Sequence, residues 1–415
     1  MKRLFRKKKP YITVLDIGTS KICGFMAHVQ SNGKVSIIGT GFMPAKGIKS
    51  GTIVDLDKAT ECIGAVLMQI EKQADKEIET VTVNVSSGQL KSRHLVKTVP
   101  IADGHPITAS DVRHLVDGMI AQGVPAEEEV LHAFPLSYTI DKEQGVAEPW
   151  GLYANQLKAH VHVVTIPETQ LRNLVMVLDR CHVEIDKKVA TPYAMGLACL
   201  LDEEKKVGAT VVDMGAGTTS FASFMDGGLV HLGLVPFGGN HLTRDIAQVL
   251  STSLTSAERL KILNGAAFLS PKDELERIIV PIIGEEEETN IHRPRSDLIK
   301  IIVPRLEDIF EKILVLLSEK EVFQVAARRI VLSGGTASLQ GIKEKTESFL
   351  QGNVRLAKLP QIKNLPNQFD SYTFMVCIGL LEYVLSSFDY KVAEKFEKPI
   401  QKTTRLGKVL KWLVK

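Results

Sequence analysis

Two short turns rich in glycine and hydroxyl side chains each follow an apolar run that ends in an aspartate. The first is Asp16–Lys21 (DIGTSK) and the second is Asp213–Thr219 (DMGAGTT). Glycine lets a backbone approach a ligand closely, and backbone N–H groups together with hydroxyls can surround a phosphate. An aspartate at the strand end can hold Mg²⁺ through water, because this ion keeps much of its hydration shell.

The two aspartates are 197 residues apart (213 − 16), which indicates two similar halves and not a short-period repeat. One such turn is usually only a turn, but two copies a domain length apart favour a site that clamps a triphosphate from both sides. We predict that Asp16 and Asp213 hold Mg²⁺, and both are candidates for a catalytic role. The predicted nucleotide-binding residues of the two turns are Gly18, Thr19, Ser20, Lys21, Gly215, Gly217, Thr218 and Thr219.

Three further segments carry candidate residues. Gly238, Gly239 and Asn240 open a predicted helix, with Asn240 as its expected N-cap, and helix N-termini attract anions. Thr255–Glu258 fits a capping box, which would give Glu258 a structural role with Lys261 as its ion partner. A glycine turn after a strand contains Gly334, Gly335, Thr336 and Ser338, and adenosine could lie against it; taken alone, it is also an ordinary strand-to-helix turn.

Strand-like and helix-like segments alternate, which indicates an α/β fold. The predicted strands are 35–42, 80–85, 228–236 and 330–333, and the predicted helices are 57–75 and 304–319. Two segments look inserted. Residues 86–165 have their own mixed pattern, and residues 240–296 are expected to be mostly helical, with the acidic run 285–288 as a solvated loop.

The segment 403–415 (TTRLGKVLKWLVK) predicts an amphipathic helix after a polar linker, 391–402. Its apolar face carries Leu406, Val409, Leu410, Leu413 and Val414, its basic residues are Arg405, Lys408, Lys411 and Lys415, and Trp412 lies at the boundary. Such a helix is typical of segments that lie in the plane of an anionic bilayer. The alternative is a helix docked on the body or on a partner.

Composition and charge argue against several classes of protein. Hydrophobic residues are 44% and charged residues 24% of the 415 residues, so disorder and fibrous repeats are not expected. The net charge of +3 combines +6 from residues 1–9 and +6 from residues 391–415 with −9 from the rest (3 − 6 − 6), which argues against nucleic acid as a partner.

Cysteine and histidine usage offers no further site. Five dispersed cysteines without a CxxC pair indicate neither a zinc site nor a disulfide framework, and favour a reducing cytoplasm. His160 and His162 share a strand face that is more simply packed or solvated than zinc-binding. No 18-residue apolar run is present.

Together these turns resemble the actin-like ATPase superfamily, and within it the chain is similar to the bacterial cell-division family FtsA over essentially its whole length. The resemblance implies an actin-like α/β fold with two duplicated lobes around a nucleotide cleft, each with an inserted subdomain. The implied first lobe is 10–85 with 166–201 and 367–390, and its insert is 86–165. The implied second lobe is 202–239 with 297–366, and its insert is 240–296.

The resemblance also implies ATP and Mg²⁺ as cofactors, with Glu258 and Lys261 against the adenosine and Gly238–Asn240 near the ribose and phosphates. The protein would polymerise with itself on the cytoplasmic face of the inner membrane at the midcell division site. It would bind the FtsZ C-terminal tail through 240–296, contact anionic lipids, and recruit other divisome proteins.

The sequence departs from the superfamily pattern at a position that matters for ATP hydrolysis. Relatives that hydrolyse ATP well often have a Glu before the Pro of the helix linking the lobes, or a Gln near it, to orient the attacking water, whereas this chain has Ala190-Thr191-Pro192. We therefore expect tight ATP binding with slow turnover.

The alternatives to an FtsA-like protein are a pilus-assembly ATPase of the PilM type, which the basic tail disfavours, and a sugar or small-molecule kinase, which would need a further catalytic Asp. A chaperone ATPase would need a peptide-binding domain.

Overall fold

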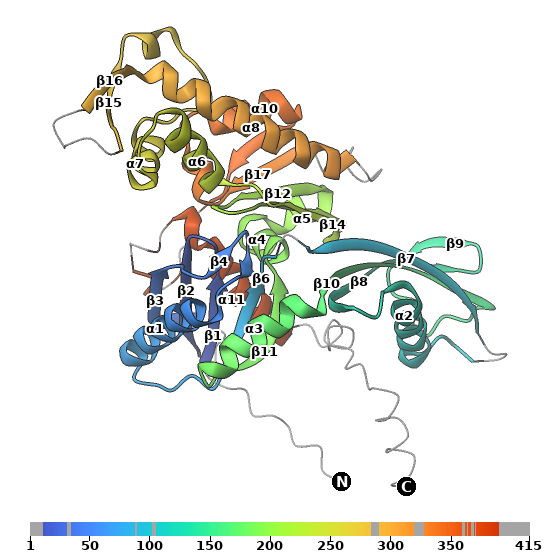
Figure 1. Ribbon diagram of the computed structural model, residues 1–415. Helices are drawn as coiled ribbons and strands as arrows, with labels where there is room; N and C mark the ends of the chain where they lie inside the picture. The colour runs from blue at the N-terminus through green and yellow to red at the C-terminus, as the bar shows by residue number, and fades with distance from the viewer. Residues whose placement is uncertain are drawn as a thin grey trace. The chain divides into compact units, whose positions relative to one another are not determined.

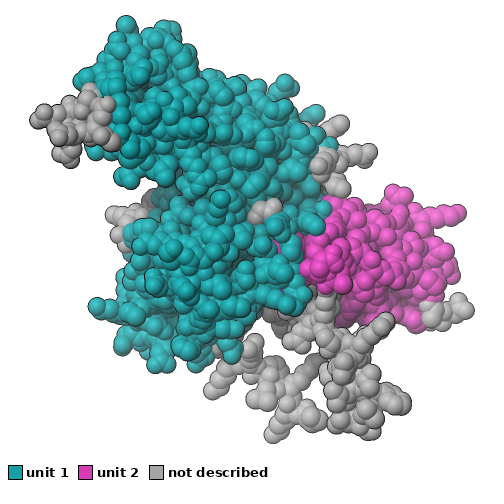
Figure 2. All heavy atoms as spheres, viewed as in Figure 1, with its two compact units in different colours: residues 1–92, 167–386 teal, residues 93–166, 387–415 magenta. Residues whose placement is uncertain are grey.

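The computed structural model describes residues 11–30, 35–87, 89–101, 105–283, 290–318, 328–358, 362, 364–366, 369 and 371–389. These residues form two compact units, one comprising the chain up to Ser92 with Pro167–Ser386 and the other built from Arg93–Ile166 (Figure 2). The basic segment 1–9, the acidic run 285–288, the predicted linker and the predicted amphipathic helix lie outside the described residues. In the part of the chain that is described, no helix has the length and apolar character needed to span a membrane.

The first unit contains two five-stranded sheets with the same topology (Figure 1). In each sheet, an antiparallel three-stranded meander is extended beside its first strand by two parallel strands. The first sheet has the order β11-β6-β1-β2-β3 and the second β18-β17-β12-β13-β14. The predicted duplication and the α/β class are therefore confirmed.

The strands of the first sheet are β1 (Tyr11–Ile17), β2 (Lys21–Val29), β3 (Val35–Pro44), β6 (Thr80–Val85) and β11 (Glu184–Ala190), with a small ribbon of β4 (Ile48–Lys49) and β5 (Thr52–Ile53). The accompanying helices are α1 (Leu56–Ala74), α3 (Glu168–Arg180), α4 (Thr191–Cys199) and α11 (Met375–Asp389). Helix α1 begins at the N-cap Asp55, whose carboxylate accepts from Lys58 N at 3.1 Å, and it packs on β2 and β3.

The strands of the second sheet are β12 (Ala209–Met214), β13 (Thr219–Met225), β14 (Gly228–Val235), β17 (Arg329–Ser333) and β18 (Asn353–Leu356). Its helices are α5 (Asp202–Val207), α6 (Gly239–Val249), α7 (Leu254–Asn264), α8 (Arg295–Ser318) and α10 (Ile342–Leu350). Helices α6, α8 and α10 pack together over a core that includes Phe221, Ile302 and Phe310 (Figure 1).

Two sequence predictions for the second lobe were wrong in extent. The helix predicted at 304–319 begins at Arg295, because Pro304 is tolerated inside α8 and does not start it. The segment 240–296 is not mostly helical, since an antiparallel ribbon joins β15 (Arg277–Pro281) to β16 (Asn290–Pro294). In β15 only Ile278 and Val280 are buried, and this alternation of burial belongs to a strand.

The described residues of the second unit form a four-stranded sheet of order β7-β10-β8-β9 and the helix α2 (Ala109–Gly123). Its strands are β7 (Lys91–Pro100), β8 (Glu128–Ile140), β9 (Glu143–Val146) and β10 (Gln156–Pro167). Thr108 and Asp111 form a capping box at the start of α2, whose apolar face packs into the core of this unit.

His162 is fully buried and stacks on Phe134, so it belongs to a packed face, one of the two alternatives that the sequence left open.

The buried His132 of β8 predicts an acid-sensitive second unit. Burial lowers its pKa from 6.5 to about 3, so the folded unit holds neutral imidazole while the unfolded chain becomes protonated below pH 6.5. The stability that neutral His132 contributes is present above pH 6.5 and is lost as the pH falls toward 3. At pH 5 we expect a loss of about 2 kcal/mol in the free energy of unfolding.

Urea unfolding at pH 7 and pH 5 checks this expectation, followed by the fluorescence of Trp150 in a Trp412→Phe background. His132→Phe should remove most of the pH-dependent loss, and His114→Gln, at an exposed position of α2, should leave it unchanged. An equal acid sensitivity in the wild type and His132→Phe would show that His132 is not its source.

Candidate functional site

The two aspartate–glycine turns line a single cavity of about 290 Å³ in the first unit. This volume is close to the lower end of the range for small-molecule sites, ~300–1,000 Å³. The turns lie so close that a methyl group added to Gly217 would come within 2.5 Å of Thr19 Oγ1. One cavity is therefore shared by residues from the two duplicated sheets.

Most of the residues predicted from the sequence line this cavity. They are Asp16, Gly18, Thr19, Ser20, Lys21, Asp213, Gly215, Gly217, Thr218, Gly239, Asn240, Glu258, Lys261, Gly334, Gly335 and Thr336. Thr219, Gly238 and Ser338 do not line it. Thr219 is buried and donates to Phe237 O, and Ser338 is exposed at the end of a 3-10 turn, so these side chains point elsewhere.

The two turns repeat the same hydrogen bond. Gly18 N donates to Lys21 O at 3.0 Å, and Gly215 N donates to Thr218 O at 3.0 Å. Each bond closes the tip of a hairpin, β1–β2 in one lobe and β12–β13 in the other. The duplication therefore extends from the strand order down to single backbone contacts at the cavity.

Asn84 is a site residue that sequence reasoning missed. Its amide Nδ2 donates to Asp16 Oδ1 at 2.7 Å and to Thr191 Oγ1 at 3.1 Å, while its Oδ1 accepts from Ile17 N at 2.7 Å. It thus fixes the orientation of the Asp16 carboxylate. The one sequence feature that could have indicated Asn84 is that it is a single amide in the otherwise strand-like run TVTVNV. This run forms β6, which pairs in parallel with β1.

The two aspartates form an electrostatically unfavourable pair in the absence of a cation. Burial and, to a lesser extent, the nearby Asp16 carboxylate together raise the pKa of Asp213 to about 7, while Lys21 opposes the shift. Burial also raises the pKa of Asp16, while Lys21 opposes that shift. The buried carboxylate of Asp16 and the half-buried carboxylate of Asp213 at one cavity are oxygen ligands that suit a hydrated Mg²⁺, so the residues present fit this ion.

The Lys21 side chain contacts two residues near the C-terminal end of the first unit. Its ammonium donates to Thr373 O and lies 4.9 Å from the centroid of the Phe374 ring. Thr373 and Val376 also line the cavity. The lysine predicted to contact phosphate is therefore at the cavity wall, in contact with the turn that precedes α11.

The glycine turn after β17 is joined to the second aspartate turn. Gly334 has φ +89°, a conformation that favours glycine, and a side chain there would meet Asp213 Oδ1 at 2.4 Å. Thr336 Oγ1 donates to Gly215 O at 3.2 Å. This segment therefore forms one wall of the cavity and restricts the position of Asp213.

Glu258 and Lys261 form the expected ion pair, with Lys261 Nζ 2.6 Å from Glu258 Oε2. The predicted capping box was wrong, because α7 begins one residue earlier than Thr255 and Ser253 caps it by accepting from Ser256 N at 3.0 Å. Lys261 Nζ also donates to Gly239 O at 3.1 Å, so the pair ties α7 to the start of α6.

The start of α6 differs from the prediction in a second way. Asn240 is not the N-cap, because Gly238 precedes the first helical residue, Gly239. The N–H groups of Gly239 and Asn240 donate to Gly215 O at 3.0 Å and to Ala216 O at 2.8 Å. These amides therefore bind the second turn itself and position it.

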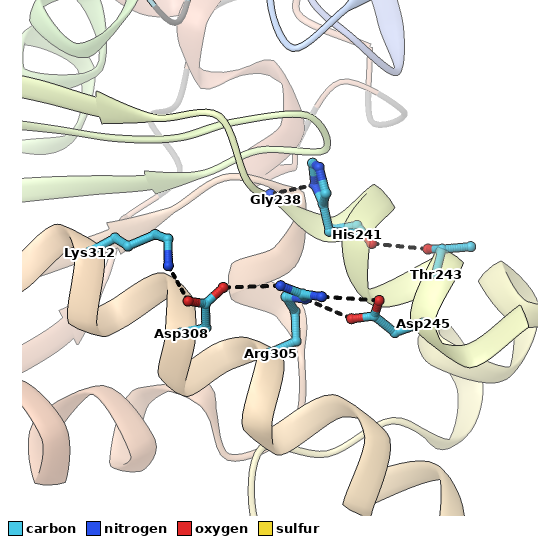
Figure 3. Close-up of polar contacts among 8 residues, drawn as sticks. Gly238, His241, Thr243, Asp245, Arg305, Asp308 and Lys312 are labelled. Carbon is cyan, nitrogen blue, oxygen red and sulfur yellow. Dashed lines mark hydrogen bonds and ion pairs between the residues drawn. The ribbon is translucent and has the colours of Figure 1, made fainter. Parts of the chain in front are cut away.

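Helix α6 is anchored on α8 by a charged cluster (Figure 3). Arg305 of α8 forms a bidentate pair with Asp245 of α6, with Nε–Oδ2 at 2.6 Å and Nη2–Oδ1 at 3.2 Å. Arg305 Nη1 also reaches Asp308 Oδ2 at 3.0 Å, and Asp308 pairs with Lys312. The anchor fixes the helix whose first residues line the cavity.

Comparison with known proteins gives the family. The sequence matches the family described as "Cell division protein FtsA" over residues 210–379 and the "SHS2 domain inserted in FTSA" over residues 87–165. The "Cell division protein FtsA" of Agrobacterium fabrum (strain C58) is 33% identical over 394 residues, which cover 92% of this chain and 89% of the relative.

Solved structures support the fold. The PilM–PilN type IV pilus biogenesis complex contains a chain with a TM-score of 0.63 and 16% identity, covering 94% of this chain and 99% of that one. MreB5 of Spiroplasma citri bound to ADP gives a TM-score of 0.56 and 13% identity over 92% of this chain and 99% of that one. These likenesses confirm the actin-like fold alone.

The PilM-type alternative is not favoured, because that likeness is 16% identical, whereas the FtsA relative is 33% identical over nearly the whole chain. The two matched family segments and this relative agree on one assignment. The chain belongs to the FtsA family of bacterial cell-division proteins.

Proposed function

We propose that this protein binds ATP with Mg²⁺ in the cavity between its two duplicated turns. The observation that supports the proposal is that Asp16 and Asp213, each at the end of the first strand of its meander, line one cavity. Lys21 would pair with phosphate oxygens, and the two aspartates would hold the ion through its waters. Glu258, Lys261 and the Gly334–Thr336 turn would contact the adenosine and ribose.

Equilibrium binding of ATP, titrated with and without Mg²⁺, tests this proposal. We expect one nucleotide per chain and an affinity that falls when Mg²⁺ is chelated. Lys21→Met should weaken binding by about tenfold or more, since a cation facing phosphate is worth about 1.5 kcal/mol or more. Lys91→Met, at an exposed lysine outside the cavity lining, is the control.

We further propose that the protein is a peripheral membrane protein of the division site that polymerises and tethers FtsZ filaments. Its family supports the role in division, and the basic amphipathic segment 403–415 supports the membrane contact. The insert 240–296 is proposed to bind the FtsZ C-terminal tail. Exposed apolar side chains in that insert, such as Leu263 and Leu275, supply a surface of the kind that binds partners.

Trp412→Glu is expected to release the protein from anionic liposomes. A carboxylate at the boundary of the apolar face removes an interfacial ring and is repelled by anionic lipid. Flotation with vesicles measures this, and deletion of 403–415 should give the same loss while Trp412→Phe retains most binding. Flotation of Trp412→Glu equal to that of the wild type would reject this membrane contact.

ATP turnover is expected below roughly 1 s⁻¹, the lower end of the usual range for enzymes. Thr191 lines the cavity and its hydroxyl accepts from Asn84, but a threonine is a poor base for activating water. Steady-state phosphate release at saturating ATP, with and without vesicles, measures the rate. Turnover well above 1 s⁻¹ in the absence of partners would mean that another group performs this role.

A further inference from the structure

Asp16, Cys23 and Cys377 bring three metal-ligating atoms together beside the cavity. Cys23 Sγ lies 3.4 Å from Cys377 Sγ and 3.7 Å from Asp16 Oδ2, and all three ligand atoms lie within 4.8 Å of one another. Both cysteines are fully buried, and Asp16 is 4% exposed. Among the described residues, this is the single such group of three His, Cys, Asp or Glu side chains.

The fold fixes each of these ligands independently. Asp16 and Cys23 are directly opposite each other in the β1–β2 hairpin, so their separation follows from strand register. Cys377 comes from α11, and its Sγ donates to Cys23 O at 3.5 Å, which seats it over β2. Asn84 holds the other oxygen of Asp16, as an outer partner commonly orients a ligand at metal sites.

The spacing suits a tetrahedral ion bound by two sulfurs and one oxygen. With metal–sulfur bonds of about 2.3 Å and metal–oxygen bonds of about 2.0–2.2 Å, tetrahedral geometry places such ligand atoms roughly 3.5–3.8 Å apart. The observed 3.4 Å and 3.7 Å are close to these values. By contrast, a disulfide needs the two sulfurs at about 2.05 Å.

We propose that Asp16, Cys23 and Cys377 form a binding site for one thiophilic divalent cation, such as Zn²⁺ or Cd²⁺, with a fourth position left for water. Thiolate ligands select these ions over Mg²⁺, which prefers six oxygens. Binding converts two thiols to thiolates and releases their two protons to solvent. Of the three ligands, Asp16 lines the cavity.

The site has a consequence that rests on the proposed function. Asp16 is also a proposed Mg²⁺ residue of the nucleotide site, so a cation held by Asp16 and the two sulfurs competes for the same carboxylate. Zn²⁺ or Cd²⁺ should therefore weaken Mg²⁺-dependent ATP binding, and excess Mg²⁺–ATP should weaken Cd²⁺ binding. Cation binding to the nucleotide-free chain does not depend on the nucleotide proposal.

Titration of the reduced full-length chain with Cd²⁺, without nucleotide, tests the site through the ultraviolet thiolate-to-cadmium charge-transfer band. We expect one Cd²⁺ per chain. Cys23→Ser/Cys377→Ser should lower the affinity by at least about 100-fold, because two ligands are lost. The matched control Cys181→Ser/Cys199→Ser removes two thiols elsewhere and should leave the band unchanged.

Several results would overturn the proposal. They are the absence of a band in the wild type, an equal loss in both double variants, and a disulfide between Cys23 and Cys377 in place of cadmium uptake. Co²⁺ gives a second readout that needs no variant, since its visible spectrum should be that of a tetrahedral ion with thiolate ligands. If Cd²⁺ binds and ATP does not, the cation site stands and the nucleotide proposal fails.

Discussion

Replacing Gly217 by valine should weaken ATP binding by at least about 100-fold, equivalent to about 2.7 kcal/mol. A Cβ at this position would lie 2.5 Å from Thr19 Oγ1, 2.7 Å from its Cγ2 and 2.8 Å from its Cβ. Thr19 cannot simply rotate away, because all three of these atoms face Gly217 and its hydroxyl accepts from Gly51 N at 2.9 Å. The new side chain must separate the two turns.

Gly228→Val is the matched control, because the nearest atom to a Cβ there is Met225 O at 3.8 Å. Fluorescent-nucleotide binding and circular dichroism of both variants separate a local effect on the cavity from a loss of fold. If Gly217→Val is folded and binds ATP within threefold of the wild type, the two turns do not act on the same nucleotide.

Replacing Gly379 by alanine should destabilise the first unit by about 3 kcal/mol. Gly379 lies in α11, and a Cβ there would be 1.9 Å from Ala194 O and 2.5 Å from Ala194 C. The obstacle is backbone of α4, so the two helices must move apart. This cost exceeds the gain of about 1 kcal/mol that alanine normally brings over glycine inside a helix.

Gly64→Ala in α1 is the control for helix propensity, since its nearest neighbour is Cys181 Sγ at 3.9 Å. This variant should be stabilised by up to about 1 kcal/mol, whereas Gly379→Ala should unfold at a clearly lower temperature. Thermal unfolding followed by circular dichroism compares them. Equal midpoints for the two variants would mean that α4 and α11 do not pack as closely as described.

Much of the fold could be predicted from the sequence because it depends on local patterns. The run TVTVNV predicts β6 at Thr80–Val85, and each hairpin is indicated by an apolar run, a glycine turn and a second apolar run. Helix boundaries that depend on tertiary packing were harder to predict from the sequence. Pro304 suggested a helix start, yet α8 continues through it because its apolar face is buried in the second lobe.

Some residues of the candidate site could likewise be predicted from local sequence patterns, and others could not. The residues of the two turns could be found because their types repeat, but Asn84 contacts Asp16 across 68 positions of the sequence, and no local pattern connects the two. Cys23 and Cys377 are 354 positions apart and meet only because α11 returns to β2. Spacing in the sequence alone suggested no metal ligands among the cysteines, since it contains no information on such returns.

If the two duplicated turns hold one Mg²⁺–nucleotide, Asp16 and Asp213 will be coupled in a double-mutant cycle on ATP binding. Binding is measured against Mg²⁺ concentration for the wild type, Asp16→Asn, Asp213→Asn and the double variant. If both carboxylates act on one ion, each single variant loses the Mg²⁺ dependence, and the two losses are not additive. Two nucleotides per chain, or Mg²⁺-dependent binding that survives in either single variant, would mean that the two turns do not share one Mg²⁺–nucleotide.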